Sequence, residues 1–315
     1  MTENSAARMP TIVAVGSAVS IGVMTAIQAR INGVLGVTLD DGILAGFVSF
    51  SVGLIALVVL LPLMPRARRG VAALWYGLRT RSIPFWMLLG GACGALTVST
   101  QGLVAGALGV ALFTVGVVAG QTLHGLVLDR IGFGPAGVVA VTPGRVIGGA
   151  LVLVAVGISL GGDVLSQAPL WMLLLPFVAG VGIAWQSAAN GRLAQRVQSP
   201  IVATFASFFG GAILLAVAAI VNIVVTGPPA PFPTEPWLYV GGLIGVVYIL
   251  LGTFIVARIG VLLLGLGSVL GQLLTSAIID LVWPAAAGPA VWQIITMVLV
   301  GLAAVFVAMP RRRRG

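Results

Sequence analysis

Residues 22–53 read GVMTAIQARINGVLGVTLDDGILAGFVSFSVG, and residues 180–211 read GVGIAWQSAANGRLAQRVQSPIVATFASFFGG. The two stretches align without a gap at an offset of 158 positions and share a QxxxNGxL element followed by SFxxG. The repeat continues further along the chain, because residues 86–129 match residues 237–280 at an offset of 151. An internal duplication of this length predicts two related halves, which we place at residues 1–165 and 166–315.

Composition places the chain in a membrane. Apolar residues make up 59% of it and charged residues 7%, whereas soluble proteins carry about a quarter charged residues. The apolar residues form runs near the roughly 20 residues that a helix needs to cross the hydrocarbon core. We therefore expect an all-α membrane protein with ten transmembrane helices, at about 11–35, 42–63, 84–105, 107–128, 142–160, 170–191, 201–225, 237–257, 259–281 and 290–309.

The arginines set the expected orientation. All sixteen basic residues are Arg, and with ten spans fifteen of them fall on one side, leaving only Arg30 on the other. The positive-inside rule then makes the crowded side, with both termini, cytoplasmic. Each half holds five spans, an odd number, so the second half enters the membrane inverted relative to the first. Two inverted five-helix repeats are typical of secondary transporters, whose site lies between the repeats near the midplane.

Other classes of function lack their signatures. The basic residues lie mostly in short gaps between apolar runs, which argues against a nucleic-acid partner. The chain has no Lys for a phosphate-binding GxxxxGK motif, a single His, no carboxylate pair placed for acid and base chemistry, and one cysteine, Cys93. We therefore expect no enzyme activity, no catalytic residue, no metal site and no cofactor.

Four amides form two pairs, Gln28 with Asn32 and Gln186 with Asn190, whose members stand four residues apart and so share a helical face. Amides in hydrocarbon need hydrogen-bond partners, so each pair must face other helices or a wet cavity. Two interpretations stay open, contacts to a solute or gate, and interhelical bonds that fix packing. Our candidates for the solute path are polar residues at matching positions of the two halves: Gln28, Asn32, Ser49, Gln121, Gln186, Asn190, Ser207 and Gln272.

Glycines four residues apart recur on the third, fourth, eighth and ninth predicted helices, where they let helix backbones approach closely. They are Gly90, Gly94, Gly116, Gly120, Gly241, Gly245, Gly267 and Gly271. Gln121 and Gln272 directly follow two of these glycines. His124, the only histidine, stands one turn after Gln121 and is a candidate proton relay, because histidine titrates near neutral pH. Asp129 and Asp280 are matching acids at helix ends, interpreted either as structural anchors or as a coupling-proton site.

The QxxxNGxL element with its following SFxxG, at Gln28 to Gly53 and again at Gln186 to Gly211, resembles the YdcZ-like branch of the drug/metabolite transporter superfamily. The resemblance covers nearly the whole chain and implies a fused ten-span carrier of the bacterial inner membrane, with a central cavity between its halves. It implies no substrate. The related small multidrug-resistance proteins carry a glutamate in the first helix, whereas this chain has no acid in the middle of its first or sixth span. That difference argues against proton-driven export of cationic drugs.

Together these observations predict a secondary active transporter that moves a small polar or amphipathic solute by alternating access. Its energy would come from a solute gradient or from protons as the coupling ion. We expect a multi-pass protein of the bacterial inner membrane, surrounded by the lipid bilayer, in which one copy suffices and a homodimer is also compatible. Two alternatives are a passive facilitator and a non-transporting scaffold or accessory subunit.

Overall fold

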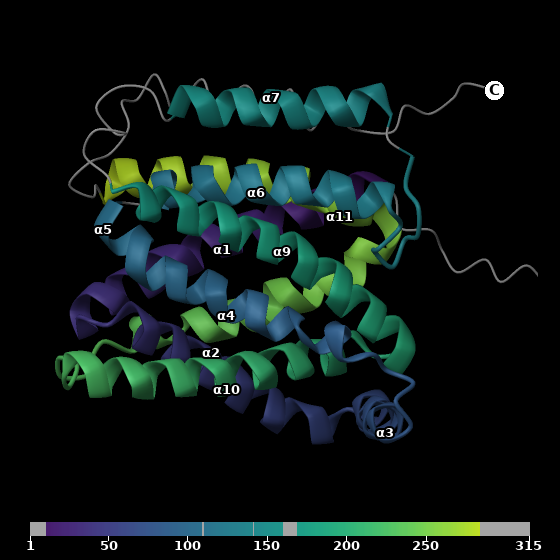
Figure 1. Cartoon of the computed structure of the whole chain (residues 1–315), viewed down its shortest axis with the longest axis horizontal. Coiled ribbons are helices and arrows are strands. Elements are labelled where there is room, and N and C mark those ends of the chain that lie inside the picture. The colour runs from purple at the N-terminus through teal and green to yellow at the C-terminus, as the bar shows by residue number, and fades with distance from the viewer. Residues whose placement is uncertain (1–10, 109, 141, 160–168, 284–315) are drawn as a thin grey trace, which may run out of the picture.

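The computed structural model describes residues 11–108, 110–140, 142–159 and 169–283, and every regular element in these ranges is a helix. Most of the helices run side by side across the view in Figure 1, from α10 at the bottom to α7 at the top. Six helices in the described part are long and apolar enough to cross a membrane. The all-α membrane class is confirmed, whereas the tenth predicted span, 290–309, lies outside the described residues.

The helices follow the predicted spans closely, with short 3-10 and π segments at several of their ends. In chain order they are α1 (Thr11–Leu39), α2 (Gly42–Leu60), η1 (Leu61–Leu63), α3 (Pro65–Arg79), η2 (Phe85–Leu88), α4 (Gly90–Thr100), the π-helix η3 (Gln101–Ala105), α5 (Gly106–Leu108), α6 (Val110–Arg130), α7 (Pro143–Ser159), α9 (Leu170–Val197), α10 (Pro200–Thr226), η4 (Pro236–Tyr239) and α11 (Gly241–Val282).

The repeated stretch folds in the same way in both places. α1 ends at Asp40, whose φ of 52° is left-handed, and α9 ends at the matching Gln198, whose φ is 54°. The next residue, Asp41 or Ser199, then precedes the new helix in extended conformation. The Asp41 carboxylate accepts hydrogen bonds from the backbone N–H groups of Ile43 and Leu44, the usual role of an N-cap. The first tight turn packs against η3 and the second against α3, so they lie at opposite ends of the bundle.

The eighth and ninth predicted spans form one element, α11, which turns at Gly260. This residue has φ 80° and ψ 172°, a conformation that only glycine adopts readily. In Figure 1 the first part of α11 lies in the middle of the bundle and the second part lies beside α6. A continuous straight helix of 42 residues would be about 63 Å long, twice the hydrocarbon thickness, whereas the turn divides α11 into two shorter parts.

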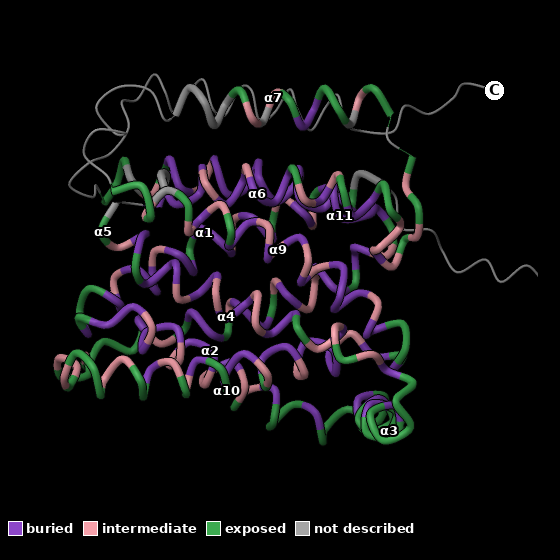
Figure 2. The backbone as a smooth tube through the Cα atoms, in the orientation of Figure 1, coloured by how far each residue is buried: buried purple, intermediate pink, exposed green. Residues whose placement is uncertain are grey.

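The arginine-rich connection between the second and third predicted spans contains a helix, α3, which the hydropathy pattern does not predict. Pro65 starts it, and Ala67, Gly70, Leu74 and Gly77 recur every three or four residues as its buried face. Figure 1 shows α3 end-on while the other helices lie lengthwise, so it crosses one end of the bundle. Figure 2 shows that much of its remaining surface is exposed.

We call the end of the bundle that carries α3 the Arg-rich end. Contacts between distant segments define it. Arg196 of α9 donates a hydrogen bond to the carbonyl of Ser82, just after α3. Arg192 donates one to the carbonyl of Gly132, after α6. Asp129 of α6 reaches the turn of α11 at Gly260. The other end holds the α1–α2 turn, α5 and Arg30.

Matching residues of the two halves meet in the interior. The rings of Phe50 and Phe208, which occupy equivalent positions in the repeat, lie 4.8 Å apart. Gly53 lies against Phe208 in the same way that Gly211 lies against Phe50. The halves therefore pack through reciprocal contacts between α2 and α10, not through two unrelated surfaces.

Candidate functional site

Hydrogen bonds close the interior on the side of α5 and Arg30. The Gln28 amide donates to the carbonyl of Gly241 over 2.8 Å and accepts a hydrogen bond from the Tyr248 hydroxyl at 2.8 Å. One turn further along α1, the Asn32 amide donates to the Gln101 side-chain oxygen over 2.7 Å. The two bonds of Gln28 join the halves, whereas the bond of Asn32 to Gln101 lies within the first half, and Gln28, Asn32 and Gln101 are buried. These bonds tie α1 to α11 and to η3.

The matching positions near the Arg-rich end are filled differently. Gln186, the counterpart of Gln28, donates to the Ser207 hydroxyl over 3.0 Å. The counterpart of Tyr248 is Thr97, and the counterpart of Gln101 is Gly252. Since a threonine and a glycine replace a tyrosine and a glutamine, the second amide pair keeps free space beside it. Asn190 and Gly252 both line a cavity there.

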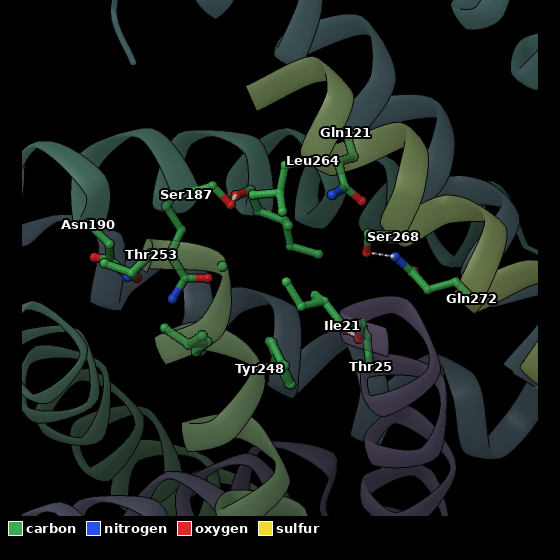
Figure 3. A pocket seen from close by; sticks show the side chains of 14 residues that line it. Ile21, Thr25, Gln121, Ser187, Asn190, Tyr248, Thr253, Leu264, Ser268 and Gln272 are labelled. Carbon is green, nitrogen blue, oxygen red and sulfur yellow. Dashed lines mark hydrogen bonds between the residues drawn. The ribbon is translucent and has the colours of Figure 1, made fainter. Parts of the chain in front are cut away.

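The cavity lies where α1, α6, α9 and both parts of α11 come together, and its volume is about 40 Å³, enough for about three water molecules. In Figure 3, Gln121, Ser268 and Gln272 lie at one end of it and Asn190 and Thr253 at the other. Its lining is mixed polar and apolar, with no Asp, Glu, Lys, Arg or His. The lining residues are Ile21, Thr25, Gln121, Ile183, Gln186, Ser187, Asn190, Tyr248, Ile249, Gly252, Thr253, Leu264, Ser268 and Gln272.

Two amide oxygens at this cavity have no protein partner. The Gln272 side chain donates to the Ser268 hydroxyl over 2.9 Å, but its Oε1 atom accepts no hydrogen bond from the described residues. Oε1 of Gln121 likewise accepts no hydrogen bond from the described residues, and the side chains of Gln121 and Gln272 are both buried. A buried amide oxygen without a partner costs about 1–3 kcal/mol, so such atoms call for an explanation. A water molecule or a polar solute that reaches these oxygens would supply the missing donors.

The structure places the eight predicted path residues around this interior, although not all at the cavity. Gln121, Gln186, Asn190 and Gln272 line it. Gln28 and Ser207 do not line the cavity, but each bonds a residue that does. Gln28 bonds Tyr248, and Ser207 bonds Gln186. Asn32 and Ser49 are buried farther toward Arg30, where Asn32 Oδ1 and the Ser49 hydroxyl have no partner among the described residues.

The predicted packing glycines fall into two groups. A Cβ atom on Gly120 or Gly271 would overlap a backbone carbonyl of the neighbouring helix, and one on Gly267 would lie 2.6 Å from Ala18 Cβ. The glycines of α4 and of the first part of α11, before the turn at Gly260, instead leave room for the amide pairs. A Cβ on Gly90 or on each of its three relatives would lie 2.5–2.7 Å from an amide side-chain atom. Those relatives are Gly94, Gly241 and Gly245. Gly116 is half-buried on α6.

An aromatic cluster at the Arg-rich end was not predicted. The Phe133 ring lies 4.7 Å from Trp86 and 4.5 Å from Trp185, and the Arg192 guanidinium lies 5.5 Å above Phe133. His124 stacks on Trp185 at 6.5 Å and is half-buried, so its role as a proton relay stays a prediction. The match of Trp86 with Trp237 in the repeat was the only sequence signal for this cluster.

A smaller arrangement of the same kind lies at the other end. The Arg30 guanidinium lies 4.8 Å above the Trp283 ring, which lies 5.8 Å from Trp237. Arg30 therefore contacts an aromatic ring and, in addition, has a buried Nε atom without a partner among the described residues. Each end of the central interior thus carries an arginine on aromatic rings.

Asp129 holds the turn of α11. Its carboxylate accepts hydrogen bonds from the backbone N–H groups of Val261 over 2.7 Å and of Leu262 over 3.1 Å, directly after Gly260. These are the free N–H groups of a helix start, where a negative charge is favourable. The structural-anchor interpretation of Asp129 therefore has a specific geometry, whereas the side chain of Asp280 lies outside the described ones.

Asp129→Ala is expected to lower the free energy of unfolding by about 3 kcal/mol, because it removes two charge-assisted hydrogen bonds and leaves buried N–H groups unpaired. Thermal unfolding in detergent measures the change. Glu235→Ala is the matched control, since this exposed carboxylate makes no capping hydrogen bond and its loss should leave the melting temperature unchanged. Equal melting temperatures for the two variants would contradict the anchor role.

Comparison with known proteins identifies the family of the chain. The profile of the family described as "Putative inner membrane exporter, YdcZ", of drug/metabolite transporter type, matches residues 13–158 and 171–307. A solved crystal structure of another protein has a TM-score of 0.59 and 17% identity over 96% of this chain and 98% of its own, a likeness of fold alone. Among curated proteins, none matches the chain significantly. Because the family profile covers most of the chain and the helices are those of a multi-pass membrane protein, the chain belongs to the YdcZ family of inner-membrane transporters.

Proposed function

We propose that the chain is a secondary transporter that moves a small, uncharged polar solute by alternating access. The observation that carries this proposal is the central cavity, which is lined by amides and hydroxyls, carries no charged side chain, and lies beside the buried, unpartnered oxygens of Gln121 and Gln272. A charged solute would find no counter-charge there, and burying an unpaired charge is costly. A solute with hydrogen-bond donors fits both oxygens.

The proposed architecture is two inverted five-helix repeats with both termini in the cytoplasm. The reciprocal contacts of Phe50 and Phe208 and the two similar turns at opposite ends of the bundle support it. The excess of arginine supports the orientation, with the Arg-rich end in the cytoplasm. Since the family is described as exporters, we propose transport from the cytoplasm outward.

Alternating access would exchange the environments of the two amide pairs. In the described state Gln28 and Asn32 are tied to α11 and η3, while Asn190 borders the cavity. The opposite state would release the first pair and close helices around the second. The arginine and aromatic clusters at the two ends are suited to covering whichever entrance is shut, because their rings exclude water and their guanidinium groups reach the headgroup region.

A two-stage screen tests the proposal. Purified protein is first heated with a library of neutral, cationic and anionic metabolites, and compounds that raise its melting temperature are then offered to vesicles containing it. We expect neutral polar compounds to stabilise the protein and to accumulate in vesicles under an imposed gradient. The vesicle stage is run with and without an imposed pH gradient, which tests protons as the coupling ion.

The other outcomes of the screen are equally specific. Stabilisation by charged compounds only would overturn the proposed class of solute. Equilibration without accumulation, whatever gradient is imposed, would indicate a passive facilitator. Failure of the whole library to bind or to enter the vesicles would favour a scaffold or accessory subunit and contradict the proposal.

A further inference from the structure

An apolar groove lies between the amphipathic helix α3 and the membrane-facing side of the bundle. α3 contributes Val71 and Trp75, η2 contributes Phe85, and α10 contributes a strip from Phe205 to Leu214. The groove has a volume of about 690 Å³, and apart from glycine every residue that lines it is hydrophobic. A second hollow of about 390 Å³ adjoins it at Val71 and Phe205 and reaches Arg68. We refer to both together as the α3 groove.

The depth of the α3 groove matches one leaflet of a bilayer. The strip from Phe205 to Leu214 covers nine residue steps of α10, or about 14 Å along the helix, and half of a hydrocarbon core is about 15 Å. α3 lies across the end of the bundle at the mouth of the groove (Figure 1). An occupant would therefore extend from the level of α3 toward the middle of the membrane.

The charge at the mouth is uniformly positive. Arg66, Arg68, Arg69, Arg79 and Arg81 lie on or just after α3. Within the described residues their guanidinium groups make no hydrogen bond or ion pair, and Arg79 only stacks 5.5 Å above the Trp75 ring. The segments that build the groove, residues 42–128 and 170–226, contain no Asp or Glu. The positive charges beside the groove thus lack any acidic partner in these segments.

We propose that the α3 groove binds an anionic phospholipid of the cytoplasmic leaflet. One acyl chain lies along α10, and the phosphate group lies between Arg68 and Arg79, which the helical spacing puts at the edge of the apolar face of α3. A second copy of the chain fits this surface less well, because it would bring two sets of unpaired arginines together. The name of the leaflet rests on the orientation proposed above, but the binding itself does not depend on transport.

Trp75 provides a direct readout, because it lines the groove and is exposed. Phospholipids with brominated acyl chains quench a tryptophan that they touch, and the difference between the native protein and Trp75→Phe isolates this one indole. The detergent-solubilised, delipidated chain is titrated with brominated phosphatidylglycerol, with brominated phosphatidylcholine carrying the same chains, and with inorganic phosphate. We expect phosphatidylglycerol to bind about thirtyfold more tightly than phosphatidylcholine, the factor that two arginines near a headgroup supply.

Two pairs of variants separate the headgroup from the chain. Arg68→Gln with Arg79→Gln should remove most of the preference for phosphatidylglycerol, whereas Arg66→Gln with Arg69→Gln removes the same charge elsewhere on α3 and should keep it. Gly210→Leu should weaken binding of both lipids, because Gly210 lines the groove and a Cβ there meets nothing closer than 3.8 Å. Val221→Phe also adds four carbon atoms to α10, two turns beyond Leu214 at the end of the groove, and should leave binding unchanged.

Three results would overturn the proposal. The first is equal quenching by both lipids in the native protein. The second is saturation of the arginine-dependent effect by inorganic phosphate alone, which would make the arginines a simple anion site. The third is a dimer of the delipidated protein that Gly210→Leu dissociates, which would assign the surface to a second copy. Because these measurements use no transported solute, their failure is distinguishable from failure of the proposed transport.

Discussion

Gly22→Ala is expected to abolish folding, with a loss of at least about 4 kcal/mol in the free energy of unfolding. Gly22 of α1 lies so close to α11 that a Cβ atom would overlap the carbonyl oxygen of Ser268. Two long helices would have to separate to make room, and the many contacts between α1 and α11 would be lost along their length. Gly180→Ala should have the same effect, because its Cβ would overlap the carbonyl of Val117 in the matching contact.

Gly16→Ala on the same helix is the matched control. A Cβ there meets no atom within 4 Å, so this variant should fold normally and gain slightly from the higher helix propensity of alanine. The yield of monodisperse protein in detergent and its melting temperature measure both outcomes. If Gly22→Ala melted like Gly16→Ala, the close approach of α1 to α11 would be wrong.

Gln121→Leu and Gln272→Leu are each expected to reduce transport at least about tenfold without lowering the melting temperature. Each change removes a buried oxygen that has no partner among the described residues, a gain that in Gln272→Leu offsets the lost hydrogen bond to Ser268, so the protein itself should be unharmed. The solute, by contrast, loses one hydrogen bond, and a loss of about 1.4 kcal/mol is a factor of ten. A role in binding the solute requires this combination, in which transport falls but the melting temperature does not.

Gln101→Leu provides the contrast for this pair. Its side chain binds Asn32 away from the cavity, so its loss leaves the Asn32 amide group unpaired and should lower the melting temperature. Transport assays in vesicles, together with unfolding of the same preparations, distinguish the cases. A fall in stability of Gln121→Leu and Gln272→Leu equal to that of Gln101→Leu would assign these glutamines to packing.

Some of the residues that the repeat predicts for the solute path lie at the cavity, and their role in transport stays a prediction. Gln121, Gln186, Asn190 and Gln272 were selected because amides in hydrocarbon need partners and because the second half carries each of them again, and all four line the cavity. Their actual partners could not be foreseen. The bonds from Tyr248 to Gln28 and from Asn32 to Gln101 join residues 220 and 69 positions apart, and only the packing of α1 against α11 and η3 brings them together.

Hydropathy alone could not resolve two features of the fold. α3 has too many arginines to count as a span, and its helical form depends on a narrow face of small residues packing on α10. The cluster of Trp86, Phe133, Trp185 and Arg192 joins η2, α9 and the connection after α6, so it has no local pattern. Both features lie at the Arg-rich end, where α3 borders the α3 groove.

By itself, the sequence determined that the chain is helical, lies in a membrane, and repeats one polar element in its two halves. Amino-acid composition and the spacing of apolar residues can be read from the sequence without knowing its tertiary contacts. They determine these features because burying polar groups in hydrocarbon is costly. The tertiary structure decided which of two nearly equal amide pairs is closed and which borders a cavity. That asymmetry arises because Gln101 and Tyr248 fill the space beside the first amide pair, while the smaller Gly252 and Thr97 stand at the matching positions beside the second. The difference in side-chain volume leaves a cavity only when the helices are packed together.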